Sequence, residues 1–466
     1  MFSAVLKNEN ARWLRAVNST VLAVVSILAV QGASAQEASA QEARTITFRD
    51  AVRIGLERNT TLRTARNVAA LDATSVSQAR AQFLPDLRWN AQGSENYGRS
   101  FSQSEGRVLD QRTQTFNTGV STGLTLFNGF ANTATLREAR LELDASEMSF
   151  ERARQTVVFT VASNFLALVQ EREQLAVRRD ALAAEEALER QINEYVEAGV
   201  RPIADLYQQQ ASVASARFTL VQAERASELA EVDLVQTLQL DPRVDYEFVP
   251  PDFSATLPSA PEHDLDELLR QAYAQRVDIE AEQNRVRAAE QGVRVARSSR
   301  LPSLSLNFGY NTAYTSAAEL GFRDQLDQRR GGSVGLGVSL PIFDRASTRV
   351  ASERARITLD NARLSAEARQ QEVGVQVRRA YLDFQAARAQ LAAAEAQQRA
   401  AELALETSRE RYEVGAATLV ELTQARATLT QAASALVSSR YNLLFQQTLM
   451  DYYVGTLDPA RFTSSE

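Results

Sequence analysis

The residues able to do chemistry in this chain of 466 residues are almost entirely carboxylates and arginines. There is no cysteine, and the only histidine is His263. Thiol nucleophiles, disulfides, Cys/His zinc or haem sites and Ser-His-Asp triads are therefore excluded, because each needs residue types that are absent or isolated. We expect no cofactor and no metal, and enzymes built only on carboxylates remain possible.

The formal net charge of -7 argues against nucleic acid as a partner. Phosphate neutralisation needs clustered cations, whereas the arginines here are interleaved with a larger number of acids. Two groups of charged residues are candidates for a functional site. Glu171, Arg172 and Glu173 align with a segment containing Arg388 in an internal repeat, and Glu402 and Glu406 lie one helical turn apart on one face.

An internal duplication organises the chain. Phe83-Leu84-Pro85 recurs as Arg300-Leu301-Pro302, Leu240-Asp241-Pro242 as Leu457-Asp458-Pro459, and the Tyr195–Gly199 segment as Tyr412–Gly415, at collinear offsets of 216 or 217 residues. Such a set indicates tandem repeats. We expect a first repeat over 45–242, a proline-rich linker over 243–262 beside a solvated His263, a second repeat over 263–459 and a tail over 460–466.

The first 35 residues have the pattern of a cleavable secretory signal. Lys7, Arg12 and Arg15 precede an apolar run that closes on Ala33-Ser34-Ala35, so the mature chain is expected to begin near Gln36. The apolar run of ten residues is too short to span ~30 Å of hydrocarbon.

Each repeat contains a very long helical region. Residues 130–198 hold neither glycine nor proline, and residues 342–414 are interrupted only by Gly374. One helix of that length would run ~100 Å, so either it is a long coiled coil or it folds back as a hairpin. Apolar residues recur every seven positions, which favours packing along a single seam; they are Leu206, Val213, Leu220, Leu234, Leu422, Leu429, Leu436, Leu443 and Met450.

Four segments alternate apolar and polar residues at period two, which predicts strands at about 87–97, 115–127, 303–312 and 332–341. Polar loops are expected over 97–114 and 313–330. The strand lengths suit a tilted crossing of a bilayer, with Ser, Asn, Gln and Gly facing a wet lumen. The residues expected to face lipid are Leu304, Leu306, Phe308, Val334, Leu336 and Val338.

Four strands cannot close a membrane sheet alone, since about eight is the smallest known barrel and an open edge in hydrocarbon costs several kcal/mol for each unpaired group. The pattern therefore predicts an oligomer that pools strands. The fold class is mainly α, with long coiled-coil hairpins and a small membrane β-barrel completed by association of chains.

The ordered set of features resembles the TolC-like outer-membrane efflux protein family. It is carried by Thr122–Gly129, by its counterpart Val338–Asp344 and by the Tyr412–Gly415 segment, and it spans Thr45 to Pro459. The resemblance implies a homotrimer with a twelve-stranded barrel in outer-membrane lipid and a helical tunnel through the periplasm. It also implies a passive exit duct for drug efflux or type I secretion, with a periplasmic adapter and an inner-membrane pump or ABC exporter as partners.

The resemblance also suggests where the periplasmic entrance lies. Helix turns are expected about 25 residues before the Tyr/Gly breaks, at 171–175 and 387–391, where Glu171, Arg172, Glu173 and Arg388 would close the entrance and contact the adapter. Above it, Glu402 and Glu406 would form an acidic ring in the lumen that attracts cations. The alternative for all six residues is an ordinary solvated helix face.

Two other functions compete with an export duct. A secreted coiled-coil structural or adhesive envelope protein explains the seven-residue repeats but not four strands of membrane length. A carboxylate-only envelope hydrolase lacks any compact paired-acid or glycine-rich motif. The sequence does not identify an exported substrate.

Overall fold

The computed structural model describes residues 44–102, 106–249 and 264–457. The expected signal peptide, His263 and the C-terminal tail lie outside these ranges. Contacts divide the described chain into two units, of which the smaller holds Arg44, Thr45 and residues 243–247. Two short strands, β1 (Arg44–Thr47) and β4 (Tyr246–Val249), pair with each other. Residues 246–249 of the expected linker over 243–262 thus form a strand.

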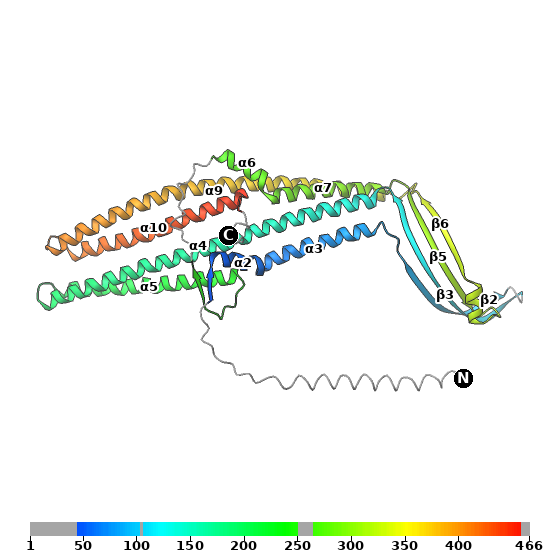
Figure 1. Cartoon of the computed structure of the whole chain (residues 1–466), viewed down its shortest axis with the longest axis horizontal. Coiled ribbons are helices and arrows are strands. Elements are labelled where there is room, and N and C mark those ends of the chain that lie inside the picture. The colour runs from blue at the N-terminus through cyan, green and yellow to red at the C-terminus, as the bar shows by residue number, and fades with distance from the viewer. Residues whose placement is uncertain (1–43, 103–105, 250–263, 458–466) are drawn as a thin grey trace, which may run out of the picture. The chain divides into compact units, whose positions relative to one another are not determined.

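The larger unit has the same order of elements in both halves (Figure 1). The first half contains α2 (Phe48–Arg58), α3 (Thr60–Ala81), β2 (Arg88–Ser102), β3 (Arg107–Asn128), α4 (Ala131–Glu197) and α5 (Ile203–Thr237). The second contains α6 (Leu265–Gln275), α7 (Val277–Ser298), β5 (Ser303–Thr315), α8 (Phe322–Gln328), β6 (Gly331–Ser339), α9 (Ser347–Glu413) and α10 (Leu419–Val454). The architecture is mainly α, as the sequence predicts.

The helices α4 and α9 are each one continuous helix of 67 residues. The expected turns at 171–175 and 387–391 are therefore wrong. Each helix is supported along its length, since α4 packs on α5 and α10 in one half and on α3 and α7 in the other. A helix of ~100 Å is stable here because neighbouring helices pack against it in both halves.

The helices reverse direction at the Tyr/Gly breaks instead. The turns Ala198–Pro202 and Val414–Thr418 join α4 to α5 and α9 to α10. Gly199 and Gly415 have φ of 73° and 75°, a left-handed conformation that glycine adopts without the clash of a Cβ. Thr418 then caps α10, because its side chain accepts a hydrogen bond from the Glu421 amide.

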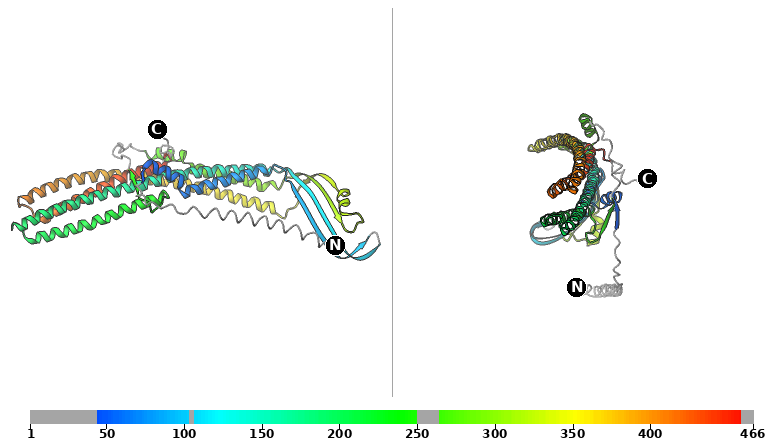
Figure 2. Two further views of the ribbon diagram at one scale, coloured as in Figure 1. Left: turned by 60° about the horizontal axis from the view of Figure 1, so that its bottom comes forward. Right: turned by 90° about the vertical axis from the view of Figure 1, so that its left-hand side faces the viewer.

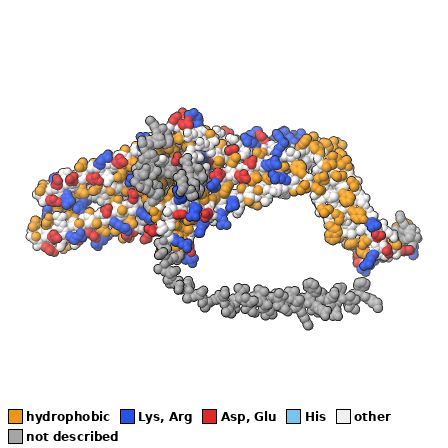
Figure 3. Space-filling view, in the orientation of Figure 1, with side chains coloured by type: hydrophobic (Ala, Val, Ile, Leu, Met, Phe, Trp, Pro, Cys, Tyr) orange, Lys and Arg blue, Asp and Glu red, His pale blue; other side chains and the backbone are white. Residues whose placement is uncertain are grey.

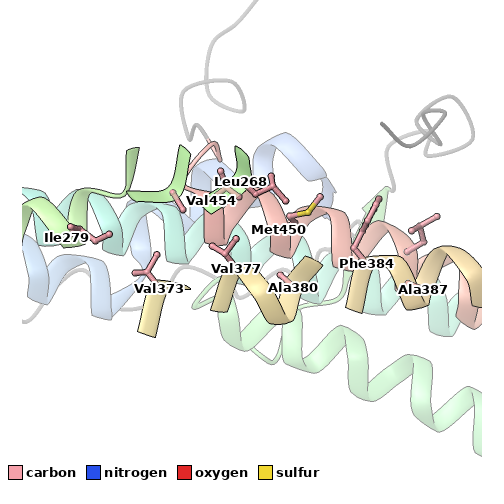
Figure 4. Packing of buried hydrophobic residues seen from close by; sticks show 11 residues of the cluster. Leu268, Ile279, Val373, Val377, Ala380, Phe384, Ala387, Met450 and Val454 are labelled. Carbon is pink, nitrogen blue, oxygen red and sulfur yellow. The ribbon is translucent and has the colours of Figure 1, made fainter. Parts of the chain in front are cut away.

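Buried apolar residues form narrow seams between the helices. One cluster joins α6, α7, α9 and α10 around Phe384, which is 1% exposed (Figure 4). Of the nine residues at the seven-residue spacing, five are buried, namely Val213, Leu234, Leu422, Leu443 and Met450. The predicted packing along a seam is confirmed.

The second sheet has four antiparallel strands in the order β2-β3-β5-β6. All four predicted strands form, but β2 and β3 continue in register as far as the pair Ser102–Arg107. The expected loop over 97–114 is therefore mostly strand, because antiparallel backbone pairing continues although most of the side chains there are polar. The other expected loop contains α8, which is held by Gln325: its side-chain amide donates to the carbonyls of Thr315 and Leu320.

Candidate functional site

The four-stranded sheet has one apolar and one polar face, set by its register. Leu304 pairs with Val338, Leu306 with Leu336 and Phe308 with Val334, so the six residues expected to face lipid lie on one side. The strand β3 adds Leu124 opposite Leu306, and β2 adds Trp89 opposite Val120. We call this set the apolar face. It is widely exposed, with Val334, Val338 and Trp89 all more than 70% accessible, and Figure 3 shows hydrophobic side chains over the strands.

The opposite side, the polar face, presents small and amide side chains. Asn307 lies opposite Gly123 and Gly335, and Asn117 lies opposite Gln92. The register also places Gly119, Gly309 and Gly337 on this side, where they add no side chain. Such a surface suits water and not hydrocarbon, whereas the apolar face suits the reverse.

The two edges of this sheet belong to β2 and β6, because each pairs with one neighbour within the described chain. Both edges present backbone groups able to accept another strand. The sheet therefore ends in two complementary sites for pairing with a further strand.

The helices that continue from the strands form a row. In the half near the turns the contacts run α5, α4, α10, α9, and in the half near the sheet they run α3, α4, α7, α9. Figure 2 shows these helices end-on as a curved layer. The outermost helices carry exposed apolar side chains: Val350, Ile357, Leu364 and Leu382 on α9, Phe218, Val221, Leu229 and Val232 on α5, and Val68 and Leu71 on α3.

The two helix turns meet at one end of the row. Arg201, from the first turn, lies with its guanidinium carbon 4.6 Å from the centroid of the Tyr412 ring and donates to the Tyr412 carbonyl. Leu188 and Ile192 pack with Leu419 and Leu422 in a buried cluster beside it. Burial raises the pKa of the Tyr412 hydroxyl, which keeps it neutral. The two hairpins are thereby tied together at their turns.

The predicted entrance residues do not come together at a turn. Arg172 lies in the middle of α4, where Nη1 donates to the Phe248 carbonyl at 2.6 Å and Nη2 approaches Glu231 at 3.5 Å. Glu173 accepts a hydrogen bond from the Tyr441 hydroxyl of α10. Burial and this bond raise the pKa of Tyr441. These two side chains hold α4 to its neighbours.

Glu171 and Arg388 differ from that pair. Glu171 lines a polar groove of about 470 Å³ that also contains Gln174 and Ser438. Arg388 is exposed on α9 and forms no ion pair with any residue that the structure describes. Glu402 and Glu406 are both exposed and lie nearer to the α9–α10 turn. The geometry thus brings only the two glutamates near the end of the hairpin.

A cluster of charged groups that the sequence did not reveal lies where α10 ends and α7 begins. Arg276, 4% exposed, donates from Nε and Nη2 to the two carboxylate oxygens of Asp278 at 2.9 and 2.6 Å, and from Nη1 to Gln376 of α9. Arg152 of α4 lies 3.9 Å from the centre of the Tyr452 ring. Burial, and then the charge of Arg276, lower the pKa of Arg152. The cluster fastens four helices together.

The repeat gives little signal for this cluster. The helices α4 and α9 are related by an offset of 216 residues, so Arg152 corresponds to Ala368 and not to Arg369, which lies beside the same cleft. Asn59 stands at the position equivalent to Arg276, so the ion pair exists in the second half only.

The described residues contain neither a metal-binding group of side chains nor a membrane-spanning helix. Among these residues, no three His, Asp or Glu side chains are grouped so as to hold a metal ion. Within the described ranges, none of the helices combines the length and the apolarity that crossing a lipid bilayer demands.

Known proteins share these features. The family model described as outer membrane efflux protein matches residues 51–238 and 268–455, one match in each repeat. The chain is 24% identical over 386 residues to the outer membrane efflux protein BepC of Brucella suis, covering 83% of this chain and 80% of BepC. It is 26% identical to protein CyaE of Bordetella pertussis, covering 76% and 72%. The outer membrane protein VceC of Vibrio cholerae superposes with a TM-score of 0.74 at 19% identity, over 88% of this chain and 96% of VceC.

Proposed function

The chain belongs to the outer membrane efflux protein family, and from this premise we propose that three copies close into one channel. The protein is an outer-membrane channel of a tripartite efflux or secretion system, and it extends into the periplasm. It is a passive exit duct. The alternative of a secreted structural coiled coil is not favoured, because the family match takes in the strands of both repeats as well as the long helices.

The observation that carries the trimer is the sheet with one apolar face and two unfilled edges. In hydrocarbon every backbone polar group needs a partner, so the edge of β6 must meet another strand. The edge of β2 in a second copy supplies one. Three chains of four strands give twelve, which is enough to close a barrel with the apolar face outward and the polar face lining water.

The helical row supports the same arrangement. A second copy that adds β2 to β6 also brings its α5 and α3 beside α9, and these are the helices with exposed apolar side chains. Such stripes along outermost helices mark surfaces that another helix covers. One rotation between copies therefore completes both the sheet and the helical layer.

We propose that the turns Ala198–Pro202 and Val414–Thr418 lie at the periplasmic entrance and meet the adapter that links the channel to an inner-membrane pump or ABC exporter. Glu402 and Glu406 are the acids we assign to a lumenal ring near this end. Three copies would gather six carboxylates there, which attract cations and repel anions. No step of catalysis is required for this role.

The trimer is tested by placing a charge in the helix edge. Leu364→Glu should convert the detergent-extracted trimer to monomers in size-exclusion chromatography with light scattering, because it puts a carboxylate where α9 meets the next copy. Gln370→Glu adds the same charge to an exposed position of α9 and should leave the trimer intact. A trimer unaffected by Leu364→Glu would contradict the assembly. Planar-bilayer conductance of the wild-type protein tests the channel itself.

A further inference from the structure

The junction between the helices and the sheet contains a hollow of about 480 Å³ that joins arginines to apolar side chains. Its walls come from the start of α4 and the end of α7. Arg137, Arg294 and Arg297 supply the charge, and Phe130 and Leu301 supply an apolar wall that is 66% and 44% exposed. Figure 3 shows basic side chains gathered where the helices meet the hydrophobic strands.

Close packing fixes the shape of this hollow. Gly129 has φ of 65°, and a Cβ there would lie 2.4 Å from the Ser298 carbonyl oxygen, so only glycine allows α4 to start against the end of α7. Phe130 follows, also left-handed with φ of 67°. The backbone thus holds an exposed aromatic ring next to the arginines.

The three guanidinium groups lack acidic partners within the described residues. Arg294 donates to the Gln291 side chain at 3.4 Å, and none of the three forms an ion pair. Elsewhere in the described chain, arginines are often paired with carboxylates, as Arg217 is with Glu186. In a protein of net charge -7, three unpaired cations around one hollow favour an anion.

The hollow is continuous with the apolar face of the sheet. The Phe130 ring lies 5.1 Å from the Phe127 ring, centroid to centroid, and Phe127 pairs with Leu304 of the apolar face. A ligand here would therefore contact cations at one end and the lipid-facing strands at the other. Free phosphate would use the first of these features only.

We propose that this hollow binds a glycerophospholipid with an anionic headgroup, from the membrane leaflet that faces the periplasm. The phosphate lies among Arg137, Arg294 and Arg297, and the acyl chains pass Phe130 and Leu301 onto the apolar face. Arginine side chains close to a membrane surface attract anionic lipid headgroups. The inference rests on the proposed orientation of the sheet in the membrane.

The test measures lipid binding to the purified full-length protein by native mass spectrometry. The probes are short-chain phosphatidylglycerol, phosphatidylethanolamine with the same acyl chains, and inorganic phosphate. We expect phosphatidylglycerol to bind more tightly than phosphatidylethanolamine. The triple variant Arg137→Gln, Arg294→Gln, Arg297→Gln should lose about tenfold or more in affinity for phosphatidylglycerol.

A matched control removes the same charge elsewhere. Arg190→Gln, Arg225→Gln and Arg399→Gln change exposed arginines of α4, α5 and α9 and should leave binding unchanged. The triple lysine variant at the three sites of the hollow keeps the charge and should retain most of the affinity. The lipid preference of the wild-type protein is measured without any variant, so poor folding of a variant does not remove the test.

Three results would overturn the inference: no preference between the two lipids, no loss in the triple glutamine variant, or equally tight binding of inorganic phosphate. Conductance in planar bilayers is recorded on the same samples. A protein that conducts normally without lipid preference contradicts this site alone, whereas a protein that neither conducts nor enters the outer membrane contradicts the proposed function.

Discussion

The sheet and the helical row differ in where they put their apolar side chains. The sheet leaves its apolar face open, with Leu336 65% and Val338 71% exposed, while the helices bury thin seams such as that around Phe384. A surface of the first kind is stable only where the solvent is apolar, and the second kind is stable in water. The two regions are therefore built for two solvents, lipid and periplasm.

The assignment of the two faces is tested most directly by a charge on the apolar face. Leu306→Arg should abolish trimer formation in the outer membrane, because arginine near the middle of the bilayer costs ~2 to 4 kcal/mol in each copy. Asn307→Arg, at the next position on the polar face, should assemble and lower conductance instead. Heat-resistant trimer on gels and single-channel recordings check both; identical behaviour of the two variants would reverse or remove the assignment of faces.

The helical seams are tested by a cavity. Phe384→Ala should destabilise the protein by about 3 to 5 kcal/mol, since it removes a ring that is 1% exposed between α6, α9 and α10. Phe384→Leu retains most of the volume and should cost much less. Thermal unfolding followed by circular dichroism measures both. Equal losses of stability in the two variants would mean that the seam accepts neither replacement side chain. No loss of stability in the alanine variant would show that the seam contributes little to the stability of the fold.

The hairpin ends are tested by comparing two arginines. Arg201→Ala removes the cation packed on the Tyr412 ring, a contact of about 0.5 to 1 kcal/mol, and should raise the open population of the channel by about two- to fivefold. Arg388→Ala should leave single-channel conductance unchanged, because this side chain lies far from the turn and forms no ion pair within the described residues. If Arg388→Ala changed the conductance and Arg201→Ala did not, the entrance would lie near the middle of the helices and not at the turns.

The acidic ring is expected to give a smaller effect. Glu402→Ala with Glu406→Ala should lower the cation preference by less than about fivefold, because exposed charges in water interact by only ~1 kcal/mol. The control, Glu353→Ala with Asp383→Ala, removes the same charge from exposed positions of α9 that lie farther from the α9–α10 turn. Reversal potentials in asymmetric salt measure the preference. If the control shifts them equally, the two glutamates are an ordinary solvated face.

The sheet was predictable from the sequence because the pleat assigns each side chain to a face. The alternation from Leu304 to Tyr310 located β5 to within a few residues, and it placed six residues on one side. The extension of β2 to Ser102 was missed, since backbone pairing there needs no apolar pattern. Strand ends depend on partners as well as on local sequence.

The helix turns show the opposite case. Gly199 followed by Pro202 and Gly415 followed by a capping Thr418 are strong local signals for a turn, yet the resemblance moved the expected turns elsewhere. The cluster of Arg276, Asp278 and Arg152 could not be predicted, because it exists only where α10 and α7 meet between α4 and α9. No spacing within one helix reveals such a contact.

The smallest expected effect concerns an acid between α4 and α7. Glu138 lies close to Gly292 and is half-buried; burial, and then the charge of Glu142, raise its pKa above the ordinary 4.5. An acid with a raised pKa in the folded state binds protons more readily there than when unfolded, so its ionised form destabilises the fold above that pKa. This cost disappears as the pH falls through the raised value toward the unfolded one.

Glu138→Gln should therefore raise the melting temperature slightly at pH 8, by an amount equivalent to about 0.5 kcal/mol, and should have no such effect near pH 4. Glu395→Gln, at an exposed position of α9, is the control and should be neutral at both values. Melting curves of the trimer at the two pH values measure the difference. If the melting temperature rises by the same amount at both pH values, the effect comes from packing of the amide, because only the carboxylate charge depends on pH in this range. The ionised Glu138 carboxylate would then not destabilise the helical row.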